Sequence, residues 1–179
     1  TRPDTLSAAV AGADHLILTV GVTKRPAPER LVKSVEYDGT LYILEAAQSA
    51  GLRGRFMYMS AIGTTKGSIL SFGLNLIKGN TLRWRRRAED EIRRSGLDFT
   101  IVHSGILSSA PAGQRAIRIS RDPLPMSLAY RISRGDVAEV FVQALRHSAT
   151  RRTTFDAVWT RGKPGTDWDP LFARLEPGT

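Results

Sequence analysis

The residues best placed to do chemistry follow a short apolar segment: His103, Ser104, Gly105 and Ile106. The segment itself, residues 99–102, is β-branched or aromatic and uncharged, which is typical of a strand covered on both faces. In open α/β sheets, ligands bind beyond the carboxyl ends of the strands. His103 is the one histidine expected at such a place, and an imidazole with a pKa of about 6.5 can act as a general acid. The competing interpretation is a strand-end histidine that bonds only to the backbone.

A basic run at residues 83–87 is a second candidate, because four arginines surround Trp84. Arginines beside an aromatic ring can bind nucleic acid by charge and by stacking. The run also fits a helix in which Arg85 and Glu89, Arg87 and Glu91, and Glu89 and Arg93 are neighbours four positions apart. Positive charge in the first turns opposes the helix dipole, which indicates an anionic partner. We favour cofactor phosphates or an acidic substrate over nucleic acid.

The elements that would position these residues alternate along the chain. The apolar patterns predict strands at residues 15–20, 55–59, 99–102 and 155–159. They predict helices at 4–11, 29–50, 133–146 and 170–175, and a charged helix that stops at Ser95 and Gly96. A loop with a helix is expected at 67–80, and a variable segment runs to Tyr130. This alternation predicts an α/β fold with a parallel, doubly wound sheet.

Composition limits the class of protein. A chain of 179 residues with 41% apolar residues predicts one globular domain over residues 1–179. The net charge is +9, but arginine far outnumbers lysine and the charges are scattered, as in proteins from GC-rich genomes. The chain has no cysteine, which excludes disulfides, thiolate chemistry and cysteine zinc sites. The three histidines lie too far apart in the sequence to form a metal motif.

The hydropathy pattern bears on membranes and on location. No apolar run approaches the ~20 residues that a spanning helix needs, and no signal peptide is visible. We therefore expect a cytoplasmic protein without a membrane partner.

Five motifs, in order, resemble those of one family. The fourth is close to the family's AE…L-x-x-SGLDYTIVRPG, and the fifth is similar to its RISRxDVA helix start. The chain resembles the atypical short-chain dehydrogenase/reductases of the NmrA-like, NAD(P)H-binding kind. Each motif is weak by itself, but five in the right order and spacing are specific. They occupy residues 6–14, 35–47, 60–63, 88–102 and 131–138.

The resemblance implies a Rossmann-like fold and oxidoreductase chemistry on a small-molecule substrate. The cofactor, NADP or NAD, would lie along the carboxyl ends of the strands, with Arg85 near its ribose. The residues implied to bind it are Gly21, Ser60, Ala61, Arg85, Ser104, Gly105 and Ile106.

The chain departs from the family at the catalytic pair, Tyr-x-x-x-Lys, whose positions fall on Thr81 and Arg85. Arg85 keeps the charge and the ribose contact, but a threonine cannot replace a phenol of pKa about 10 as general acid. His103 is then the candidate proton donor. A dinucleotide sensor or scaffold without catalytic activity is the alternative function, and a nucleic-acid-binding module is a weaker one.

The family's first strand and its glycine motif, G-x-x-G-x-x-G, do not occur in this sequence. The sequence starts at a point roughly 60 residues into the family's domain, after the phosphate-binding turn. We therefore expect the C-terminal two-thirds of that domain, without its first strands. The open edge of the 15–20 strand would be completed by a partner chain or within a homo-oligomer.

Overall fold

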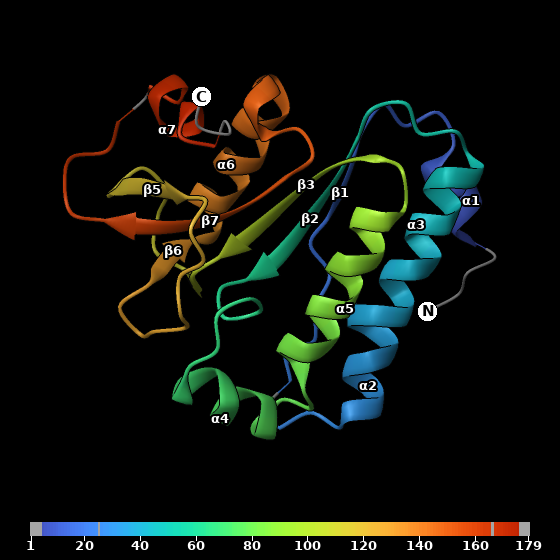
Figure 1. The fold of residues 1–179 in the computed structure, drawn as a ribbon, viewed down its shortest axis with the longest axis horizontal. Helices are drawn as coiled ribbons and strands as arrows, with labels where there is room; N and C mark the ends of the chain where they lie inside the picture. The colour runs from blue at the N-terminus through green and yellow to red at the C-terminus, as the bar shows by residue number, and fades with distance from the viewer. Residues whose placement is uncertain (1–4, 25, 166, 176–179) are drawn as a thin grey trace.

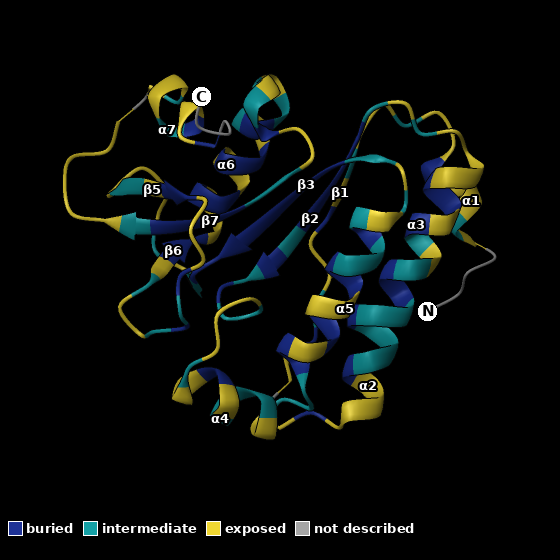
Figure 2. Cartoon of the chain, in the orientation of Figure 1, coloured by how far each residue is buried: buried dark blue, intermediate teal, exposed yellow. Residues whose placement is uncertain are grey.

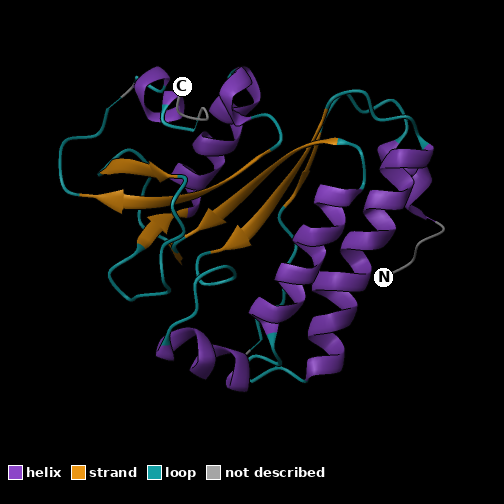
Figure 3. Ribbon diagram, in the orientation of Figure 1, coloured by secondary structure: helices purple, strands orange, loops and turns teal. Residues whose placement is uncertain are grey.

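The computed structural model describes residues 5–24, 26–165 and 167–175, in which helices and strands alternate (Figures 1 and 3). The strands are β1 (Leu16–Leu18), β2 (Arg55–Ala61), β3 (Asp98–Ser104), β4 (Ile106–Ser108), β5 (Ala116–Ser120), β6 (Arg131–Ser133) and β7 (Thr153–Thr160). The helices are α1 (Leu6–Val10), α2 (Glu29–Lys33), α3 (Gly39–Ser49), α4 (Ile69–Ile77), α5 (Thr81–Arg94), α6 (Arg134–Arg146) and α7 (Asp169–Ala173). A π-helical turn, η2 (Ser34–Asp38), joins α2 to α3, and a 3-10 turn, η3 (Ser148–Thr150), follows α6.

The main sheet has five strands in the order β1-β2-β3-β7-β5. Its first four strands are parallel, which confirms the predicted Rossmann-like arrangement. The fifth strand, β5, is antiparallel to β7 and lies in the segment expected to be variable. The same segment holds β4, which forms a separate parallel pair with β6. The strands β4, β5 and β6 were not predicted, because strands of three to five residues carry too little periodicity to be distinguished from loop.

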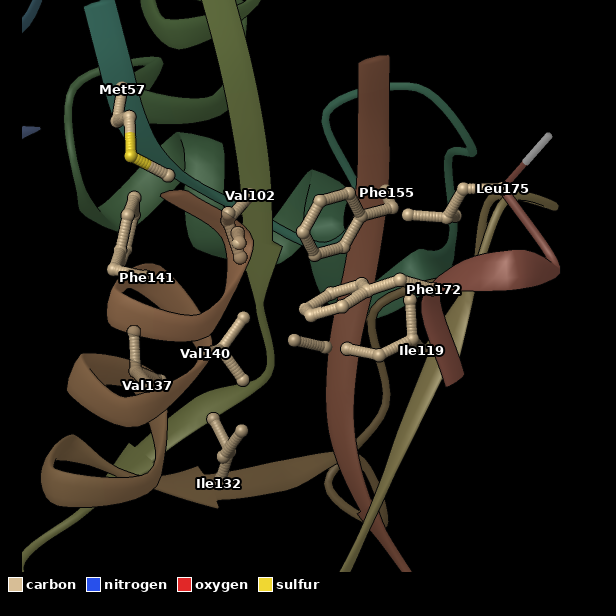
Figure 4. Packing of buried hydrophobic residues seen from close by; sticks show 12 residues of the cluster. Met57, Val102, Ile119, Ile132, Val137, Val140, Phe141, Phe155, Phe172 and Leu175 are labelled. Carbon is tan, nitrogen blue, oxygen red and sulfur yellow. The ribbon is translucent and has the colours of Figure 1, made fainter. Parts of the chain in front are cut away.

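Helices cover both faces of the main sheet. Phe56 and Tyr58 of β2 pack with α3 and α5, whereas Met57, between them, packs with α6 on the opposite face. Side chains alternate in this way because successive residues of a strand point to opposite faces. Figure 4 shows the α6 side, where Phe141 lies beside Met57 and Phe172 of α7 packs against Phe155 of β7. The central strands β2 and β3 are therefore buried along most of their length (Figure 2).

The ends of the elements follow local signals, with one correction. Gly51 and Gly96 adopt φ of +67° and +79° where α3 and α5 have ended, and the Ser133 side chain caps α6. The strand predicted at 99–102 extends further, because His103 and Ser104 still pair with β2 and β7. The loop after the strand therefore begins at Gly105.

The strand β1 lies at one edge of the sheet and pairs with β2 alone among the described residues. Its Ile17 is 44% exposed. Completion of this edge by a partner stays a prediction. No helix in the described ranges is long and apolar enough to cross a lipid bilayer.

Candidate functional site

A cleft of about 740 Å³ opens at the carboxyl ends of β1, β2 and β3. Parallel strands place their carboxyl ends at one edge, so residues far apart in sequence meet there. All seven residues predicted to bind the cofactor line this cleft: Gly21, Ser60, Ala61, Arg85, Ser104, Gly105 and Ile106. These seven residues lie at the edge of the sheet where we expected the cofactor, and their role in binding it stays a prediction.

The cleft combines polar and apolar lining residues. Those with hydroxyl groups near the strand ends, called its polar side here, are Thr19, Ser60, Thr81 and Ser104, and apolar Val22, Ile62 and Leu107 lie among them. The other side is apolar and comes from α4, α6 and the loop before β6; its side chains are Leu70, Leu74, Met126, Leu128, Val137 and Phe141. Lys78, Arg85 and Arg134 also line the cleft. Among the described lining residues, none carries a carboxylate, a phenol or an imidazole.

These features fit a phosphate-bearing dinucleotide. A cleft with three cations and no lining carboxylate does not repel phosphate groups. Gly21, three residues beyond β1, lets the Arg85 guanidinium lie against the backbone at the edge of the cleft, since a β-carbon there would collide with it. The cleft and the donor set therefore suit the cofactor implied by the sequence motifs.

Arg85 and Glu36 form a buried ion pair beneath the polar side. The Arg85 Nε lies 3.2 Å from Oε2 of Glu36, and its Nη1 donates to the Met59 carbonyl at 2.8 Å. Its Nη2 donates to Glu36 Oε1 and to the Val20 carbonyl, both at 3.4 Å. All three nitrogens of the guanidinium are thus in contact with Glu36 or a backbone carbonyl. Arg85 therefore ties α5 to β2 and to the segment that follows β1.

Glu36 is a positioning residue that the sequence analysis missed. It is 1% exposed, accepts a hydrogen bond from the Val22 amide at 3.0 Å, and also accepts one from the Thr81 hydroxyl. It therefore holds both residues at the family's catalytic positions. One feature of the sequence could have identified Glu36: it places a carboxylate four residues after Val32, on the apolar face of the predicted helix. Glu36 also lies in a π-helical turn, a feature frequent at functional sites.

His103 lies behind the cleft rather than in its lining. It is 3% exposed, its Nδ1 is 2.9 Å from Asp156 Oδ1, and its Nε2 is 3.0 Å from Glu89 Oε1. Burial alone would lower the pKa of His103, but the hydrogen bonds and charges of Asp156 and Glu89 outweigh it and raise that pKa to about 9. Both nitrogens are engaged, so the geometry favours a structural imidazolium. The general-acid role stays a prediction that this arrangement does not support.

Glu89 connects this buried cluster to the cleft. Burial would raise its pKa, but the hydrogen bond and charge of His103 and the Ser60 hydroxyl lower it to about 2. Ser60 donates from Oγ to Glu89 Oε1 at 2.6 Å, and Arg93 donates to Oε2 at 2.9 Å. Ser60 is thereby held in one orientation at the polar side of the cleft.

The basic run does not form a stacking site for bases. Trp84 is 8% exposed and donates from Nε1 to Glu29 at 3.0 Å. Lys33 and Arg87 lie over its ring, at 5.5 and 4.7 Å from the centroid. The expected pairing of Arg85 with Glu89 is wrong, because Arg85 turns toward the strand ends.

The predicted pairing of Arg87 with Glu91 is likewise replaced, by the contact of Arg87 with the indole ring. The expected pair of Glu89 and Arg93 does form, at 2.9 Å. Within the basic run at residues 83–87, Arg86 pairs with Asp90 of the same helix, at 3.6 Å. The helix thus satisfies much of its own positive charge.

Comparison with known proteins agrees with this geometry. A family model described as NAD(P)H-binding matches residues 1–148. Sanguinarine reductase of Eschscholzia californica is 30% identical over 127 residues, which are 69% of this chain and 45% of that protein. The chain thus spans less than half the length of that relative.

Solved structures share the fold. A putative NAD-dependent epimerase/dehydratase from Bacillus halodurans has a TM-score of 0.73 and 25% identity, over 88% of this chain and 69% of that one. A short-chain dehydrogenase/reductase from Veillonella parvula, solved in complex with NADP, has a TM-score of 0.67 and 19% identity, over 94% and 71% of the two chains.

Proposed function

Because this chain belongs to the NAD(P)H-binding family, we propose that its cleft serves an NAD(P)H-dependent reductase that acts on a flat, apolar small molecule. The observation that carries the proposal is the union of a polar and an apolar side in one cleft. When bound, the reduced cofactor supplies a hydride. The name of sanguinarine reductase supports a small-molecule acceptor.

The lining narrows the class of acceptor. Reduction of a simple ketone requires a proton donor at the developing alkoxide. The described lining offers hydroxyls and cations but no group that titrates near neutral pH as an acid. We therefore propose acceptors that are electron-poor and take their proton from water, such as quinones and activated carbonyls. The leucines of α4 and Phe141 of α6 would pack against the flat ring.

Steady-state oxidation of NADPH by the whole protein tests this proposal. A 1,4-naphthoquinone should be reduced, whereas an aliphatic ketone should not. Leu74→Asp, in the lining, should raise KM for the quinone about tenfold or more, because it places a charge in the apolar side. Leu76→Asp, on the same helix but 71% exposed and outside the lining, is the matched control.

The same lining favours one alternative, a dinucleotide sensor without catalytic activity. Cofactor binding with no turnover of any quinone or carbonyl would refute the reductase and leave the sensor. Arg85→Lys should weaken NADPH binding while Arg86→Lys does not, since Arg86 pairs with Asp90 and lies outside the cleft lining. Absence of cofactor binding in the whole protein would refute both functions.

A further inference from the structure

A second, open hollow adjoins the cofactor cleft: Leu128 lines the cleft, and the next residue, Ala129, lines the hollow. Its volume is about 610 Å³, and the two linings have no residue in common. Three arginines and two aromatic side chains line it: Arg115, Arg131, Arg161, Tyr130 and Trp159. Ala129, Thr160 and Gly162 complete the lining, so the described residues around this arginine hollow include no carboxylate.

Strand pairing brings two of the arginines together. The strands β5 and β7 are antiparallel, and their last pair at this end is Ala116 with Thr160. Arg115 and Arg161 are the next residues outward, so the register directs them to opposite positions. Arg131 joins them from the first position of β6. Like charges at opposite positions of two strands repel each other and cost stability.

Within the described part of the chain, no counter-charge pairs with these three exposed arginines. There, no hydrogen bond or ion pair engages the side chain of Arg115, Arg131 or Arg161. The Arg115 guanidinium lies over the Trp159 ring, and its carbon is 5.1 Å from the ring centroid. Guanidinium groups that converge without a counter-charge provide the planar donors that oxyanions require.

The aromatic wall of the hollow is held rigidly. The Trp159 Nε1 donates to Asp136 Oδ2 at 2.7 Å. Asp136 is 3% exposed, and it also accepts hydrogen bonds from Ser133 Oγ and from the Gly113 amide, both at 2.8 Å. The indole therefore keeps one orientation, with Arg115 stacked on it. A preorganised wall lowers the entropic cost of ligand binding.

We propose that the arginine hollow binds a small organic polyanion, with phosphate or carboxylate groups, at a site distinct from the cofactor cleft. The arginines would hold the oxyanions in bidentate fashion, and Trp159 would pack against the body of the ligand. The volume suits an organic ligand better than a single inorganic ion, since ligand pockets measure about 300–1,000 Å³.

Isothermal titration calorimetry of the whole protein tests the proposal with pyrophosphate and citrate as probes. The probe that binds with the lower Kd indicates whether the site prefers phosphate or carboxylate groups. Arg161→Gln should weaken the tighter probe about tenfold, the loss expected when one charge-assisted bidentate contact disappears. Arg118→Gln is the matched control, because it removes an exposed arginine of β5 outside the hollow. It should change the affinity less than twofold.

Three results would overturn the proposal. An equal loss in Arg118→Gln and Arg161→Gln would show general surface charge instead of a site. Binding of a single-stranded oligonucleotide but of neither small anion would indicate a nucleic-acid surface. An equal loss of NADPH affinity in Arg161→Gln would assign the hollow to the cofactor site. Unchanged NADPH binding together with weakened pyrophosphate or citrate would support two separate sites.

Discussion

Deprotonation of His103 is expected to destabilise the folded chain, because its imidazolium lies between the buried carboxylates of Glu89 and Asp156. The pKa of His103 is raised from 6.5 to about 9 in the folded state. The stabilisation is thus fully present below pH 6.5, and it is lost as the pH rises through about 9.

The size of the effect follows from proton linkage. Between these two pKa values the folded state keeps a proton that the unfolded state has released. The free energy of unfolding therefore falls by about 1.4 kcal/mol per pH unit, or about 3 kcal/mol in all. The pKa of Glu89, lowered to about 2, acts in the opposite direction: its contribution is present above pH 4.5 and is lost as the pH falls through about 2. For this cluster, stability should be greatest between pH 4.5 and 6.5.

Urea unfolding followed by tryptophan fluorescence, from pH 6 to 9.5, measures this loss. His103→Gln should be less stable at pH 6 and should lack the steep decline. His147→Gln, a change at a histidine outside the cluster, should keep the decline of the unmodified protein. Parallel declines in the unmodified protein and His103→Gln would refute the argument, as would an NMR titration that places the His103 pKa at or below 6.5.

Two further variants separate the cleft from the rest of the fold. Gly21→Ala should raise the Kd for NADPH about tenfold and lower the unfolding free energy by about 3 kcal/mol, because its β-carbon displaces the Arg85 guanidinium from its buried pair with Glu36. Fluorescence titration and urea unfolding measure the two effects; equal cofactor affinity would contradict the role of Gly21. Arg55→Met should cost about 3 kcal/mol in urea unfolding and leave NADPH binding unchanged. Arg55 is the first residue of β2, at the end away from the cleft, and the change removes its buried 2.6 Å hydrogen bonds to the Ala144 carbonyl and to the Thr150 hydroxyl. Weakened NADPH binding in this variant would refute the claim that the two regions are independent.

Local pattern predicted most of the elements. The β-branched run at 99–102 became the centre of β3, and the 29–50 periodicity became the continuous helical segment from α2 to α3. Both contain enough residues to show which faces are buried. The strands β4 and β6 have three residues each, and their pairing depends on a partner far away in the sequence.

The sequence by itself determined the α/β order of elements and the four parallel strands, because strand ends can be recognised locally and parallel strands end at one edge. The seven cleft residues, Arg85 on its helix included, were placed by the family resemblance. Only the tertiary structure decided what each side chain does there. Arg85 acquires its partner Glu36 from 49 positions away. His103 is enclosed by Glu89 and Asp156, which are 14 and 53 positions away. Protonation and accessibility depend on burial and on nearby charges, and folding alone brings those groups together.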